Sequence, residues 1–106
     1  MRSSMEANCL RFLQFVQKRY GVIESILYEP LGFTVGPQKI RYVPDFKITY
    51  EDGYSLFLEV KGFLDYSSIA KIQGFKKTTG LDLYYIGNQE YKRIERNYKY
   101  RLKNWE

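Results

Sequence analysis

The chain has 106 residues, the size of one domain that can bury a single hydrophobic core. Apolar residues make up 44% and aromatic residues 18% of the sequence, which excludes a disordered chain. Lysine and arginine number 17 against 12 acidic residues, so the formal charge is +5, which suits a nucleic-acid partner but does not identify one.

Two absences narrow the classes of site further. The sequence contains no histidine, which excludes histidine-based acid–base catalysis and the usual zinc sites. Cys9 is the one cysteine, so no intramolecular disulfide can form, and a cytoplasmic setting and a core position for Cys9 are expected. Because no apolar run approaches membrane-spanning length and no signal-peptide pattern is present, we expect no membrane partner.

Residues 3–20 are predicted to form a helix, since apolar residues recur there at helical spacing and Gly21 follows as a terminator. Glu6 lies in the first turn, on the edge of the apolar face. Two interpretations of Glu6 stay open. With Ser3 it forms a capping-box pattern, in which the glutamate bonds back to the helix start. Alternatively, Glu6 is an acidic member of a functional site near this helix end, where the helix dipole favours anions.

The next segment, residues 23–35, is predicted to contain a strand from about residue 26 to residue 31 and onward. Gly36-Pro37 then breaks the pattern. Residues 38–41 lead into the following strand and carry Lys39 and Arg41, which are candidate phosphate contacts.

A β-hairpin is predicted from residues 42–50 and 54–61, joined at the turn Glu51-Asp52-Gly53. Side chains alternate along a strand, so the apolar residues of both strands can cover one core. That alternation leaves Asp45, Glu59 and Lys61 projecting together on the opposite side.

Two converging carboxylates repel each other unless a cation lies between them. Mg²⁺ takes oxygen ligands and keeps several waters, so Asp45 and Glu59 are a sufficient protein contribution. Lys61 could orient an attacking water or stabilise charge on a phosphate. Gly62 follows, where a bulky side chain would crowd whatever approaches. The alternative interpretation is a half-exposed hairpin that carries ordinary surface charges.

The remaining elements are two helices and a strand. A helix start at residues 65–68 and a stop at Gly80 bracket a basic helix, on which Lys71 and Gln73 are candidate substrate contacts. Residues 81–86 are predicted to form an interior strand, and residues 88–105 a basic amphipathic helix. This order predicts one α/β or α+β domain over residues 1–106, with a mixed sheet flanked by helices.

The spacing Pro44-Asp45, 13 residues, then Glu59-x-Lys61, with Glu6 on the first helix, resembles the PD-(D/E)XK nuclease superfamily. The added pieces Tyr28-Glu29 and Lys61-Gly62 make the chain most similar to the endonuclease I group of bacteriophage Holliday junction resolvases. The similarity extends from about residue 2 to about residue 87.

The resemblance implies a restriction-endonuclease-like core with a central mixed four-stranded sheet. It implies Glu6, Asp45 and Glu59 as ligands of Mg²⁺, for which Mn²⁺ could substitute, and Lys61 as the catalytic lysine. Lys71 is carried over only as substrate-binding. The implied activity is endonucleolytic hydrolysis of DNA, with preference for branched substrates and a homodimeric enzyme, located in the host cytoplasm if phage-encoded.

Three alternatives remain at this point. One is a site-specific phage or mobile-element endonuclease, which would cut linear duplex at a defined sequence. Another is a non-catalytic nucleic-acid-binding module, which would bind DNA without cleaving it in any divalent metal. A third is a subunit that cuts only together with a partner protein.

Overall fold

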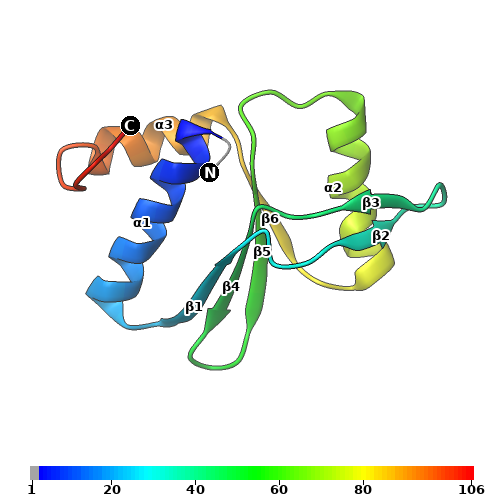
Figure 1. Cartoon of the computed structure of the whole chain (residues 1–106), viewed down its shortest axis with the longest axis horizontal. Helices are drawn as coiled ribbons and strands as arrows, with labels where there is room; N and C mark the ends of the chain where they lie inside the picture. Colours follow the sequence, from blue (N-terminus) through cyan, green and yellow to red (C-terminus); the bar gives the residue numbers. More distant parts are fainter. Residues whose placement is uncertain (1–2) are drawn as a thin grey trace.

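The computed structural model describes residues 3–106, and within this range the fold is α+β, with a four-stranded mixed sheet, a two-stranded hairpin and three helices (Figure 1). The elements in chain order are α1 (Ser4–Tyr20), β1 (Ile23–Tyr28), β2 (Phe33–Val35), β3 (Ile40–Tyr42), β4 (Phe46–Tyr50), β5 (Ser55–Val60), α2 (Tyr66–Thr79), β6 (Leu83–Ile86) and α3 (Asn88–Tyr98). None of the helices in the described range is both long enough and apolar enough to cross a membrane.

The main sheet has the strand order β1-β4-β5-β6. The first three strands are antiparallel, and β6 pairs parallel to β5 after the chain has passed through α2. Helices α1 and α3 lie on one side of this sheet, and α2 with the β2–β3 hairpin lies on the other (Figure 1). The predicted mixed sheet flanked by helices is therefore confirmed.

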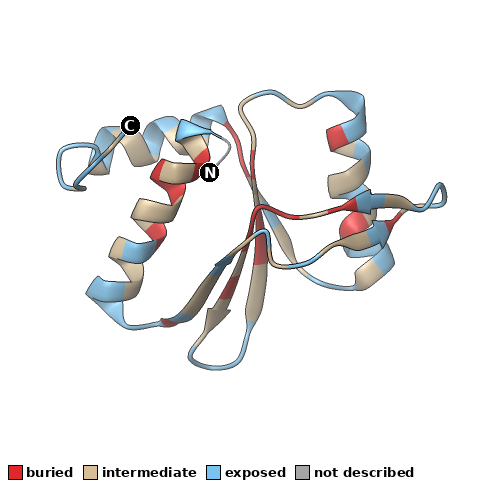
Figure 2. Ribbon diagram, viewed as in Figure 1, coloured by how far each residue is buried: buried red, intermediate tan, exposed pale blue. Residues whose placement is uncertain are grey.

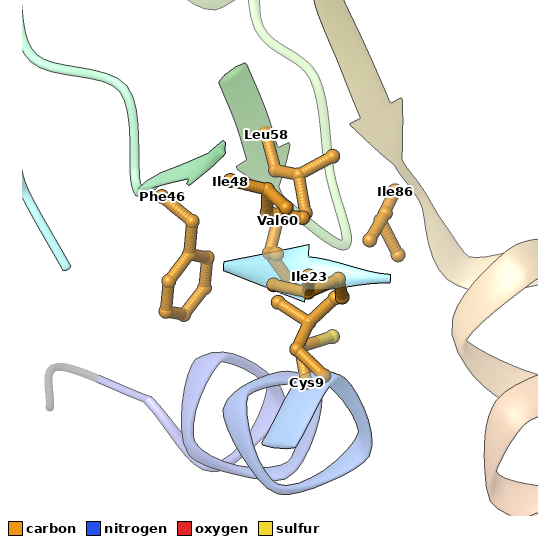
Figure 3. Packing of buried hydrophobic residues seen from close by; sticks show 8 residues of the cluster. Cys9, Ile23, Phe46, Ile48, Leu58, Val60 and Ile86 are labelled. Carbon is orange, nitrogen blue, oxygen red and sulfur yellow. The ribbon is translucent and has the colours of Figure 1, made fainter. Parts of the chain in front are cut away.

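The core on the α1 side is largely aliphatic. The register pairs Phe46 with Leu58, and Ile48 with Leu56, so the apolar side chains of the hairpin share the face that α1 covers, as predicted. Cys9 projects from α1 into this cluster and is buried (Figure 3). Burial, together with the nearby charges of Asp45 and Glu6, raises the pKa of the Cys9 thiol to about 12.

The core on the α2 side is aromatic. It contains Val35, Tyr42, Phe57 and Phe75, and the ring of Phe75 contacts the rings of both Phe57 and Tyr42 at centroid distances of 5.3 and 5.9 Å. Figure 2 shows buried residues on both sides of the sheet. The face of β5 that carries Glu59 is therefore covered by the aromatic core around Phe57. The polar residues of this face, Glu59 and Lys61, come at or just after the carboxyl end of the strand.

Helix boundaries agree with the predicted caps. The Ser3 hydroxyl accepts a hydrogen bond from the Glu6 backbone N–H (3.1 Å), and Asp65 accepts one from the Ser68 backbone N–H (2.8 Å). Gly21 and Gly80 end α1 and α2 at φ values of 68° and 75°, a conformation in which a side chain is strained.

The strand predicted for residues 26–31 is displaced. Strand β1 starts earlier, at Ile23, and ends at Tyr28, because Glu29 has a positive φ of 47° and Pro30 has no N–H to donate. Tyr42, which was assigned to the following strand, pairs with Phe33 in the separate β2–β3 hairpin.

Two predictions near the carboxyl terminus are wrong. Strand β6 is an edge strand and not an interior one, with Tyr84 51% exposed. Helix α3 ends at Tyr98 and not at residue 105. A continuous helix would separate Tyr91 and Trp105 by about 21 Å, whereas their rings stack with centroids 6.0 Å apart. The chain therefore turns back, and buried Asn8 holds the backbone of Glu106.

Candidate active site

A cleft of about 580 Å³ opens where α1, the carboxyl end of β5 and α2 meet. All four residues predicted to be catalytic line it, namely Glu6, Asp45, Glu59 and Lys61. The carboxylates come from the first turn of α1, the link between β3 and β4, and the end of β5. Residues separated by more than fifty positions in the chain thus share one surface.

Glu6 lies in the first turn of α1, which Ser3 caps, and it also lines the cleft. Its carboxylate is 6% exposed and accepts hydrogen bonds from the Tyr28 hydroxyl (2.8 Å) and from the Ser3 hydroxyl (3.2 Å). The Ser3 oxygen also accepts from the Glu6 backbone N–H. Glu6 therefore bonds back to the helix start through the Ser3 hydroxyl and also lines the cleft, because the helix start is itself a wall of the cleft.

Asp45 is 2% exposed, and its position follows from the residues around it. Strand β4 begins one residue later, so the backbone N–H of Val60 faces the Asp45 side chain and donates to Oδ2 (2.8 Å). The Asp45 carbonyl accepts from the backbone N–H of Glu29 (2.7 Å). The Asp45 carboxylate is thus held by a backbone N–H at the end of β5, and the Asp45 carbonyl is bonded to the backbone that follows β1.

Glu59 lies at the end of β5 and accepts a hydrogen bond from the Tyr42 hydroxyl (2.8 Å). Burial, followed by the charge of Glu59 and this hydrogen bond, raises the pKa of Tyr42 far above its ordinary value. Tyr42 consequently remains a phenol over the whole physiological range and acts as a donor to the carboxylate.

Lys61 and Gly62 are fixed through their backbones. The Lys61 N–H donates to the carbonyl of Ile86 (3.1 Å), and its carbonyl accepts from the Tyr85 hydroxyl (2.5 Å). The Gly62 carbonyl accepts from the Asn88 side-chain amide (2.9 Å). A Cβ at position 62 would lie 3.1 Å from Asn88 Oδ1 and 3.4 Å from Met5 Sδ, so a side chain here would require the Asn88 side chain to shift by a few tenths of an ångström.

The predicted substrate contacts divide into two groups. Arg41 and Lys71 line the cleft with Lys61. Gln73 instead lines a second hollow of about 600 Å³ between α2 and the β2–β3 turn, and Lys39 lies in that turn at a φ of 54°. Two residues along a helix turn the side chain through about 200°, which is why Lys71 and Gln73 face different hollows.

Three residues of the site were not selected from the sequence as functional. The hydroxyls of Tyr28 and Tyr42 hold two of the carboxylates, and Glu29 adds a fourth acidic residue to the cleft lining. The local patterns place both tyrosines in strands, and no short-range signal marks them as donors. Glu29-Pro30 offered a weak signal, since a residue before proline at a strand end often adopts an unusual backbone.

The donor set suits a hard divalent cation. The cleft offers carboxylate oxygens and contains no histidine or cysteine ligand, which is the chemistry that Mg²⁺ and Mn²⁺ prefer. Among residues 3–106, however, no three acidic, cysteine or histidine side chains are already arranged to hold a metal. The cleft therefore fits Mg²⁺ in the type of its ligands, and two of the carboxylates with waters would be a sufficient set.

Comparison with known proteins assigns no family to the chain. No protein-family model matches the sequence, and no curated protein matches it. The nuclease resemblance therefore stays a prediction that depends on the motifs and on the cleft in which their residues meet.

Proposed function

We propose that this protein is a Mg²⁺-dependent endodeoxyribonuclease with a restriction-endonuclease-like core and a preference for branched DNA. The observation that carries the proposal is the convergence of Glu6, Asp45, Glu59 and Lys61 on one cleft. Mutually repelling carboxylates and a lysine, brought together from three separate elements, form a typical site for metal-assisted phosphoryl transfer.

Each side chain has a role that follows from its chemistry. Asp45 and Glu59 would hold Mg²⁺ together with waters, and Glu6 would complete or support the site; Mg²⁺ when bound lowers the pKa of a water and neutralises phosphate charge. Lys61 stabilises the charge that develops on the phosphate under attack. In the hydrolysis one bond forms between the water oxygen and phosphorus, one ester bond breaks, and the departing oxygen takes up a proton.

Substrate attraction is supported by the cations at the cleft. Arg41 of β3 and Lys71 of α2 line the cleft together with Lys61, so a DNA strand in the cleft would meet cations from more than one element. The net charge of +5 acts in the same direction over longer distances. A homodimer would supply the two clefts that paired cuts at a junction require.

The proposal is tested by a cleavage assay at near-neutral pH. A four-way junction, its matched linear duplex and a single strand are offered with Mg²⁺, Mn²⁺ or Ca²⁺, and sedimentation gives the oligomeric state. We expect paired nicks in the junction, lost by at least about 100-fold in Asp45→Asn. This variant keeps an acceptor for the Val60 N–H, so we expect it to fold, which circular dichroism checks. Glu24→Gln, an exposed carboxylate of β1, is the matched control and should cut normally.

Other outcomes would contradict the proposal in distinguishable ways. Cutting of linear duplex at a defined sequence would identify a site-specific endonuclease. DNA binding without cleavage in any metal would identify a binding module or a subunit that needs a partner. Full activity of Asp45→Asn would remove the cleft from the mechanism.

A further inference from the structure

The guanidinium of Arg41, which lines the cleft, lies directly against Gly32. A Cβ added at position 32 would lie 2.6 Å from Nη2, 2.7 Å from Cζ and 3.1 Å from Nη1 of Arg41. Because the central carbon is almost as near as the closer nitrogen, the Gly32 backbone faces the flat side of the guanidinium and not its edge. Side-chain carbons essentially never approach another atom within 3.0 Å, so no residue other than glycine fits beneath Arg41 as it now lies.

The register of the β2–β3 hairpin gives the direction in which Arg41 leans. Thr34 is the residue opposite Arg41, and Gly32 comes two residues earlier, at the diagonal position that a long side chain can reach. This diagonal lies at the end of the hairpin where β3 continues to Val43 and Asp45, both of which line the cleft. Arg41 therefore leans along the hairpin towards the cleft and away from the turn at the other end.

The backbone beneath the guanidinium is anchored in the aromatic core. Phe33 and Tyr42, the residues next to Gly32 and Arg41, pair with each other in the hairpin. Both contact the fully buried ring of Phe75, at centroid distances of 5.0 and 5.9 Å. A long side chain that lies on a fixed surface loses less conformational freedom when a ligand binds it.

The chemistry of Arg41 determines which ligand fits. Among residues 3–106, which the structure describes, Arg41 forms no ion pair. With one face against Gly32, its N–H edges are the groups that remain for a ligand, and this planar fork matches a phosphate with two parallel hydrogen bonds. Lys61 and Lys71 in the same cleft are point charges without this directionality. A backbone phosphate is therefore the ligand that suits Arg41.

We propose that Gly32 is a positioning residue that lets Arg41 lie flat against the hairpin and present its N–H edge to one backbone phosphate of the DNA strand in the cleft. This inference rests on the proposed function for its ligand. It goes further by assigning a directional phosphate contact to Arg41 and the orientation of that contact to Gly32, which touches no DNA.

The test is a double-mutant cycle on DNA binding, measured by fluorescence anisotropy with the four-way junction in Ca²⁺. Gly32→Ala displaces the guanidinium and should weaken binding by about 3- to 12-fold. Arg41→Lys keeps the charge but loses the planar fork, and it should weaken binding by about 2- to 12-fold. Added to Arg41→Lys, Gly32→Ala should cost less than about 2-fold more, because no guanidinium is left to displace.

Two further variants identify the ligand and control for the added methyl group. Arg41→Gln removes the charge and should make the slope of log K against log salt concentration shallower by about 0.9, whereas Gly32→Ala should leave that slope unchanged. Gly74→Ala adds a methyl group from α2 against the same hairpin, at an ordinary 3.4 Å from the backbone nitrogen of Gly36, and it should bind DNA normally. Circular dichroism and urea unfolding check the fold of each variant.

The outcomes also separate this inference from the proposed function. Equal losses from Gly32→Ala in the wild-type and Arg41→Lys backgrounds, or an equal loss in Gly74→Ala, would show that the methyl group acts on the fold and would overturn the role of Gly32. Wild-type affinity of Gly32→Ala, or an unchanged salt slope in Arg41→Gln, would overturn the inference and leave the nuclease proposal intact. Absence of any DNA binding by the wild-type protein would overturn both proposals together.

Discussion

Two tyrosine–carboxylate pairs in the cleft are built from opposite faces of the sheet. Tyr28 belongs to the aliphatic core under α1 and donates to Glu6, whereas Tyr42 belongs to the aromatic core under α2 and donates to Glu59. Both hydrogen bonds are 2.8 Å long. The two cores therefore meet at the cleft, and each core orients one carboxylate through a phenol.

The pairs differ in how firmly they are held. Tyr42 is 5% exposed and packs against Phe75, which has no exposed surface, while Tyr28 is only half-buried and packs against Phe46. Glu6 also accepts from Ser3, so Ser3 continues to hold its carboxylate when the Tyr28 hydroxyl is removed. The α2 side should consequently be the more sensitive of the two to substitution.

The largest expected effect is on stability. Phe75→Ala should lower the free energy of unfolding by about 3–5 kcal/mol, because it leaves a cavity in a fully packed aromatic cluster. Urea denaturation followed by circular dichroism measures this. Phe63→Ala, which removes an exposed ring, should change stability by less than about 0.5 kcal/mol. Equal losses of unfolding free energy in the two variants would show that Phe75 is not buried in the aromatic core.

Alkaline pH should lower the free energy of unfolding through Cys9 on the α1 side of the sheet and through Tyr42 on the α2 side. The Cys9 thiol has a pKa of about 12 in the folded chain against 9.0 as its ordinary value. Above pH 9 the unfolded chain therefore binds fewer protons than the folded one, and stability falls as pH rises towards 12. The contribution of Cys9 is at most about 1.4 kcal/mol per pH unit.

Comparison with Cys9→Ala isolates that contribution. The variant should lose part of the slope of unfolding free energy between pH 9 and pH 11. The slope that remains includes Tyr42, whose pKa is raised in the same direction on the other face. Identical slopes in the two proteins would show that the thiol is not protected by the α1 core.

Tyr42→Phe is the direct test of the tyrosine on the α2 side. Removing the donor releases one constraint on Glu59, and loss of such an outer partner typically lowers metal affinity about 10- to 100-fold. The Mg²⁺ concentration needed for half-maximal cleavage should rise accordingly. An unchanged Mg²⁺ dependence would contradict a role for Tyr42 in positioning the carboxylate.

Tyr28→Phe should produce a smaller rise, below about 10-fold, because Ser3 still donates to Glu6. A third pair of the same chemistry provides the control. The Tyr54 hydroxyl donates to Asp82 (2.6 Å), but both side chains are partly exposed and lie outside the cleft lining. Tyr54→Phe should leave the Mg²⁺ dependence of cleavage unchanged. A larger effect of Tyr54→Phe than of Tyr28→Phe would contradict a role for the Tyr28 hydrogen bond in metal binding.

Local chemistry was enough to predict much of this molecule. Caps such as Ser3 and Asp65 act within four residues, so the starts of α1 and α2 can be read directly from the sequence. The alternation of side chains in the hairpin likewise brought Glu59 and Lys61 to one end of β5. Both depend only on neighbours in the chain.

The parts that were missed depend on distant partners or on helix phase. Tyr28 bonds a residue 22 positions away and Tyr42 one that is 17 positions away, so no local spacing marks either hydroxyl. Gln73 was grouped with Lys71 because both are near the motif, although the helix turns them to different hollows. The return of the last residues follows from the buried amide of Asn8, a contact that spans almost the whole chain.

The close approach at Gly62 has an evolutionary consequence. The Asn88 side chain at the start of α3 contacts the backbone of Gly62, directly after Lys61, and a side chain at position 62 would meet it. Relatives of this chain should accept a side chain at position 62 most readily where position 88 carries a smaller residue. Covariation between these two positions would therefore mark the subset of sequences in which the third helix supports the end of the motif strand.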